Sequence, residues 1–211
     1  MPIVLNGSTG ITTEGMNVDT IVDTAGTGGP SLPNNIVEMD FVDVLGDITN
    51  LETNKLDKDQ NIVLGTSVPA SGTAVDFVGI PDGVKRITVM FDGVSTNGTS
   101  PFIVQLGTSA GVENSGYVGG GTALVDSTAN TTGFAIRVVT AGNLISVPMS
   151  ILKTSGNSYI ASHAGWRTGV NVGLYGGGSK TLSGTLDRIR ITTVNGTDTF
   201  GAGTINISWE F

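Results

Sequence analysis

The sequence predicts an all-β protein: an antiparallel β-sandwich head of the jelly-roll kind, behind a short N-terminal extension and a helical stalk. Three observations support this fold class. Apolar residues recur with a period of two over most of residues 61–211, and Gly-rich or Asn-Gly turns separate the apolar stretches. Charge forms the third observation, because residues 1–60 carry ten Asp and Glu against two Lys, whereas residues 61–211 carry eight acids and eight bases. We therefore expect three regions: 1–35, 36–60 and 61–211.

Residues 1–35 are rich in Gly, Thr, Asn and Asp, and residues 18–22 form their one candidate strand. Such a composition buries little apolar surface on its own. We expect this segment to be ordered by attachment to a partner. A terminus without a role is the alternative.

Residues 36–60 fit two structures. Five apolar residues are spaced 4-3-4-3, as in the apolar seam of a coiled coil: Val37, Phe41, Val44, Ile48 and Leu51. Residues 37–41 also alternate as a strand would. We expect an extended segment to about residue 45 and a helix over residues 47–58. A helix of this length is marginal alone in water, so we expect three copies to form a trimeric stalk. Packing of the helix on the core of its own monomer is the alternative.

From residue 61 onward, the alternation predicts eight to ten strands. The clearest cover residues 74–80, 87–91, 102–106, 134–139, 144–152, 158–162, 170–175, 189–191 and 205–211. The two triple-glycine runs, residues 119–121 and 176–178, are interpreted as turns. The final strand has an apolar face and should be a core strand or a seam between subunits.

Composition excludes several classes of protein. The pI of about 4.4 and the absence of a basic stripe argue against nucleic acid as a partner. No apolar run approaches 18 residues, so no membrane insertion is expected. The N-terminal residues lack the features of a secretory signal. With no cysteine, disulfides and thiolate metal sites are excluded, and we expect no metal and no cofactor.

Catalytic motifs are absent. His163 is the only histidine, and no Gly-x-Ser-x-Gly elbow accompanies it. The glycine runs lack the Lys-Ser/Thr of a phosphate-binding loop. Spacing pairs no two carboxylates for glycoside hydrolysis. We therefore expect no enzyme and no catalytic residue.

One cluster has the composition of a glycan-binding loop. Apolar C–H faces of sugars stack on aromatic rings, and sugar hydroxyls bind planar polar groups. The candidate binding residues are Tyr159, His163, Trp166, Arg167 and Tyr175, with Tyr117 and Asn97 as secondary candidates. A buried core position is the alternative for Trp166.

Three stretches carry a resemblance to a known family. The stretch GGGSKTLSGTLDRIRITTVNGTDTF at residues 176–200 resembles the C-terminal segment of many tail fibres and tail-spike-like proteins of tailed bacteriophages. The stretch IPDGVKRITVMF at residues 80–91 is similar to the opening of the same head domain, and IVLNGSTGI at residues 3–11 resembles the start of phage tail proteins.

The resemblance implies a homotrimeric virion protein. Its N-terminus would bind a tail or baseplate protein, and its head would bind a polysaccharide or lipopolysaccharide on the host surface during adsorption. The family's head domains share no catalytic signature, so the resemblance assigns no site residues. The alternatives are a structural adaptor or capsid-decorating fibre, and a polysaccharide depolymerase.

Overall fold

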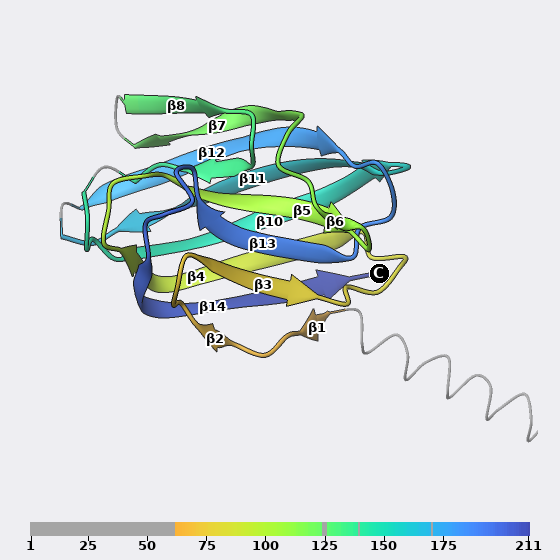
Figure 1. Cartoon of the computed structure of the whole chain (residues 1–211), viewed down its shortest axis with the longest axis horizontal. Coiled ribbons are helices and arrows are strands. Elements are labelled where there is room, and N and C mark those ends of the chain that lie inside the picture. Colours follow the sequence, from red (N-terminus) through yellow and green to blue (C-terminus); the bar gives the residue numbers. More distant parts are fainter. Residues whose placement is uncertain (1–61, 124–125, 139, 170) are drawn as a thin grey trace, which may run out of the picture. The chain divides into compact units, whose positions relative to one another are not determined.

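The computed structural model describes residues 62–123, 126–138, 140–169 and 171–211 (Figure 1). These residues belong to the second of two units into which the chain divides, Thr53–Phe211. The described part contains 14 strands and no helix, which confirms the all-β prediction. The predicted attachment segment (1–35) and helical stalk (36–60) lie outside the described residues.

Nine strands form a large antiparallel sheet. Its order is β1 (Val63–Leu64), β14 (Phe200–Glu210), β4 (Arg86–Thr96), β10 (Ile145–Ser155), β11 (Ser158–Arg167), β12 (Val172–Thr181), β7 (Tyr117–Ala123) and β8 (Asp126–Asn130), and β2 (Val68–Pro69) also pairs with β14. The successive strands β10, β11 and β12 are direct neighbours and form a meander.

Five strands form the smaller antiparallel sheet. Its order is β3 (Ala74–Val78), β13 (Arg188–Thr193), β5 (Phe102–Thr108) and β6 (Gly111–Val112), and β9 (Phe134–Ile136) also pairs with β5. The small sheet lies against one face of the large sheet (Figure 1).

A single hydrophobic core fills the space between the sheets. It is formed by alternate residues of each long strand, such as Val89 and Phe91 from β4 and Ile189 and Ile191 from β13. This pattern is typical of a sheet that buries one face. The last strand contributes Ile205 and Ile207 to the core, so it is a core strand, as its alternation predicted.

The structure corrects the interpretation of the glycine runs. Residues 119–121 and 176–178 are not turns but the middles of β7 and β12, and they pair with one another in register. A Cβ on Gly121 would lie 2.5 Å from the carbonyl oxygen of Ala135, and one on Gly119 would lie 2.3 Å from that of Gly177. Glycine is therefore required for close backbone approach rather than for turning. We call these six residues the glycine ladder.

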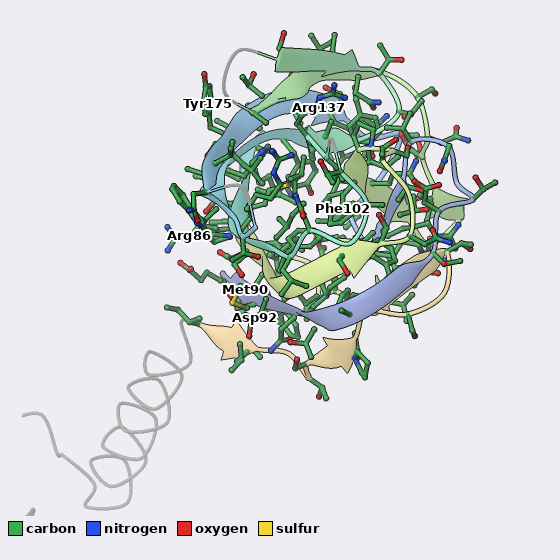
Figure 2. The ribbon with its side chains drawn as sticks, turned by 90° about the vertical axis from the view of Figure 1, so that its left-hand side faces the viewer. Arg86, Met90, Asp92, Phe102, Arg137 and Tyr175 are labelled. Carbon is green, nitrogen blue, oxygen red and sulfur yellow. The ribbon has the colours of Figure 1, made fainter. Side chains whose placement is uncertain are left out.

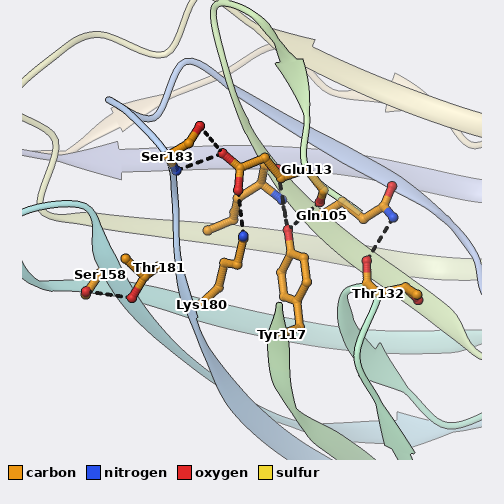
Figure 3. A network of polar contacts seen from close by, with 9 residues as sticks. Gln105, Glu113, Tyr117, Thr132, Ser158, Lys180, Thr181 and Ser183 are labelled. Atoms are coloured by element: carbon orange, nitrogen blue, oxygen red, sulfur yellow. Dashed lines mark hydrogen bonds and ion pairs between the residues drawn. The ribbon is translucent and has the colours of Figure 1, made fainter. Parts of the chain in front are cut away.

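A partly buried ion pair joins the two sheets at the end where β7 begins (Figure 3). The Lys180 ammonium lies 2.5 Å from a Glu113 carboxylate oxygen, and Ser183 donates to the other oxygen through its backbone N–H and its hydroxyl. The Tyr117 hydroxyl accepts a hydrogen bond from the backbone N–H of Leu106 in the small sheet. Burial alone would raise the pKa of the Glu113 carboxyl, but the bonds from Lys180 and Ser183 lower it. These contacts connect β12 and β7 to the small sheet.

Candidate functional site

The cluster singled out in the sequence lies on a strand. β11 continues to Arg167, so residues 163–167 do not form the expected loop. Side chains of successive strand residues point to opposite faces of a sheet. The cluster is therefore divided between the core and the outer surface of the large sheet.

His163 and Arg167 point into the core and are 5% and 4% exposed. Neither imidazole nitrogen of His163 has a hydrogen-bond partner, and Nε and Nη1 of Arg167 also have none. Burial lowers the pKa of His163 to about 4, because the charged imidazolium loses its hydration. The expectation that these two side chains form part of a surface loop is wrong, since the alternation of β11 turns them inward.

The two tyrosines at the other end of the cluster are also buried. Tyr159 is 3% and Tyr117 is 1% exposed. Burial raises the pKa of both phenols. Tyr117 packs edge-on against Phe134 and holds the ion-pair network described above. Both residues therefore lie in the packed interior, away from the surface at which a glycan would bind.

Trp166 and Tyr175 point outward, and they are 48% and 55% exposed. Trp166 lies opposite Gly173 of β12, and Tyr175 is two residues farther along that strand. They are therefore diagonal neighbours on one face, with Cβ atoms roughly 7 Å apart. Figure 2 shows Tyr175 projecting from the outer surface of the large sheet, on the opposite side from the core residue Phe102. We call Trp166 and Tyr175 the aromatic shelf.

Small residues surround the aromatic shelf. Ser146 and Gly173 lie opposite Trp166, while Ala164 and Thr122 lie opposite Tyr175. A Cβ on Gly173 would meet no atom within 4 Å, so the space beside Trp166 is open. The neighbours therefore leave the ring faces accessible to a ligand.

The small neighbours were not recognised as part of a site from the sequence. Glycine, alanine, serine and threonine carry no chemistry that marks them. Their importance follows only from the register that places them beside the rings.

Two exposed rings on a flat sheet suit a ligand with apolar C–H surfaces. An aromatic ring has a negative face, which attracts the weakly positive hydrogens of a pyranose ring. Two rings at this spacing offer two contact points to an extended chain. The shelf contains no charged side chain, so it favours a neutral ligand surface.

Asn97 is exposed but lies apart from the shelf. It follows β4, and β10 separates that strand from β11. The Asn97 Oδ1 accepts a hydrogen bond from the backbone N–H of Thr199 at 2.8 Å, which fixes the loop. Asn97 therefore joins the end of β4 to the residue before β14, and it does not contact Trp166 through a paired strand.

Two other classes of site are absent from the described part of the chain. It contains no cluster of three or more His, Cys, Asp or Glu side chains that could bind a metal ion. No helix within the same residues has the length and hydropathy of a membrane span.

No protein-family model, no curated protein and no solved structure matches this chain. The resemblance to phage tail fibres therefore stays a prediction.

Proposed function

We propose that the chain is a receptor-binding protein of a bacteriophage tail fibre, and that its β domain binds a host surface glycan through the aromatic shelf. The observation that carries the proposal is the pair of exposed rings, Trp166 and Tyr175, flanked by small residues on a flat sheet. The sequence resemblance supplies the phage context. A protein with this role would be located in the virion, as part of the tail fibre.

The position of the shelf supports this role. The described chain begins beside β1, where Val63 pairs with Trp209. The residues that pair in turn across β14, β4 and β10 lead from Val63 to Ala161 on β11, so these two residues lie at the same level along the strands. Trp166 is five residues farther along β11, or about 17 Å at the rise of an extended strand. The shelf is thus displaced toward the end of the domain opposite the point at which the chain enters it.

Weak glycan contacts gain strength from multiplicity. We propose a homotrimer joined through a helical stalk at residues 36–60, with residues 1–35 bound to a tail or baseplate protein. Three linked domains convert the second and third contacts into intramolecular events. Chromatography with light scattering on the full chain tests the assembly, and a monomer at micromolar concentration would contradict it.

Substitution of the shelf tests the binding function. Trp166→Ala and Tyr175→Ala should abolish binding to an array of bacterial O-antigen and capsule polysaccharides, with little change in melting temperature because both side chains are exposed. Ile160→Ala is the matched control, since Ile160 lies on the same strand and face and is 47% exposed. It should bind as the wild type does.

Three results would contradict the proposal. The first is wild-type protein that binds no polysaccharide on the array. The second is shelf variants that bind unchanged. The third is release of reducing sugar from a bound polysaccharide, which would indicate a depolymerase instead.

A further inference from the structure

A polar groove of about 410 Å³ lies on the outer face of the small sheet, on the opposite side of the domain from the aromatic shelf. Gln105 of β5 and Thr192 of β13 contribute to its lining, with Ala74 of β3 on one side and Thr132 on the other. Its volume falls in the range of small-molecule sites, about 300–1,000 Å³. Neither the sequence motifs nor the aromatic shelf accounts for it.

Gln105 is held rigidly in the groove. It is 7% exposed although it lies on the outer face, because residues 130–133 fold over it. Its Nε2 donates to the carbonyl oxygen of Thr132 at 2.9 Å (Figure 3). Asn130 fixes the covering loop, since its Oδ1 accepts hydrogen bonds from the backbone N–H groups of Thr132 and Gly133. The Gln105 Oε1 makes no hydrogen bond to a described residue and is left as an oriented acceptor.

Arg190 supplies a fixed donor on the neighbouring strand. Its Nε and Nη2 donate to the two carboxylate oxygens of Asp76, each at 2.7 Å. This paired arrangement fixes the guanidinium plane and offsets its charge. The Nη1 group is not used by Asp76 and makes no hydrogen bond recorded within the described ranges.

The chemistry of the groove defines the ligand class. A phosphate or an acidic sugar would favour uncompensated positive charge, but Asp76 neutralises Arg190. An apolar ligand would cover the Gln105 Oε1 without giving it a hydrogen-bond donor, which is costly. A sugar hydroxyl both donates and accepts, so it can bind the Gln105 Oε1 and the Arg190 Nη1 together.

We propose that this groove is a second glycan-binding site, which binds the hydroxyl groups of a short neutral saccharide through Gln105 and Arg190. It goes beyond the proposed function, because the groove and the shelf lie on opposite faces and would bind independently. A domain with two such sites can contact two positions on a polysaccharide-coated surface.

Blocking the groove tests this site directly. Ala74 is exposed at the rim, so Ala74→Trp fills the groove without disturbing the core. Val78→Trp is the matched control, because Val78 lies on the same strand and outer face, is 67% exposed and does not line the groove. Gln105→Met is a second variant that removes the amide at similar size.

The probe is a panel of neutral trisaccharides built from glucose, galactose, mannose, rhamnose and N-acetylglucosamine, measured by saturation-transfer NMR and titration on the full chain. At least one trisaccharide should bind with an affinity that Ala74→Trp weakens about tenfold or more, because the indole occupies the space of the ligand. Val78→Trp and Trp166→Ala should leave that affinity unchanged, and Gln105→Met should weaken it.

Two outcomes would overturn the second site. One is a panel in which no trisaccharide binds, or in which binding survives Ala74→Trp. The other is binding that Trp166→Ala also removes, because the two faces would then not act separately. Failure of the shelf is distinguishable, since it would leave the groove affinity intact while the polysaccharide array showed no effect of Trp166→Ala.

Discussion

Replacement of the buried His163 should remove a defined part of the acid sensitivity of the domain. The imidazole is 5% exposed, neither nitrogen has a partner, and its pKa is lowered to about 4 from an ordinary value of 6.5. A Cβ on Gly176 would lie 2.6 Å from its Cε1, so the ring lies directly against the glycine ladder.

The sign of the effect follows from the protons bound by each state. Between pH 6.5 and pH 4 the unfolded chain binds a proton at His163 and the folded chain does not, so the free energy of unfolding falls as the pH falls. A pKa of about 4 in the folded state gives a loss of about 2 kcal/mol between pH 7 and pH 5, and of about 3 kcal/mol by pH 4. The contribution is fully present only above pH 6.5.

Urea unfolding at pH 7 and pH 5 measures this loss. His163→Met replaces the ring with a flexible apolar side chain that adapts to irregular space. The difference in unfolding free energy between the two pH values should be about 2 kcal/mol smaller in the variant than in the wild type. Comparison within each protein cancels any change in packing that does not depend on pH, and the contribution of Glu113 is the same in the wild type and the variant.

An equal pH dependence in the two proteins would refute the reasoning. It would mean that His163 is protonated in the folded state or has the same pKa in both states. A direct NMR titration should likewise show that the imidazole is largely neutral at pH 5 in the folded protein, since that pH is about one unit above its pKa of about 4.

Four further predictions concern stability. Lys180→Met should cost about 1–3 kcal/mol in urea unfolding, less than for a fully buried pair because the Glu113 side chain is 21% exposed and Ser183 still binds its carboxylate; an unchanged midpoint would contradict the network. Gly121→Ala should lower the free energy of unfolding by about 1–3 kcal/mol, because the new methyl group crowds the backbone of β9. Gly173→Ala has open space around it and should change the free energy of unfolding by no more than about 0.5 kcal/mol. Equal effects of the two variants would contradict the requirement for glycine in the glycine ladder. Because the pKa of Glu113 is lowered, Glu113→Gln should reduce the further loss of stability as the pH falls below 4.5, measured as a shallower slope than the wild type. Deletion of residues 208–211 should give insoluble protein, since it removes the partner of β1 and part of β14; soluble folded material would contradict the pairing.

The strands that the sequence predicted are those in which side chains alternate. The expected strands at residues 102–106 and 189–191 correspond to β5 and β13, and that at 158–162 is the first half of β11. β7 was missed because its centre is glycine, which has no side chain to reveal a period of two. Its pairing with β12 depends on contacts between residues about 55 positions apart, which local pattern reasoning does not include.

The candidate site was located only in part for a similar reason. Both faces of β11 contain apolar and polar residues, so the pattern does not tell which face is buried. Trp166 is exposed and His163 is buried because the register with β10 turns odd-numbered residues inward. The groove was not predicted, because Gln105 lines it only through the covering loop at residues 130–133. Such non-local placement has no signature in the sequence near Gln105.

The separation between β1 and the aromatic shelf along the strands has a mechanical consequence. β14, β4 and β10 lie between β1 and β11, so the two points are also about 19 Å apart across the sheet, and a load between them runs obliquely to the strands. Such a load has a component along the strands, which shears the ladder hydrogen bonds together, and a component across the strands, which pulls neighbouring strands apart. Tension through a bound ligand is therefore distributed over the five strands from β1 to β11.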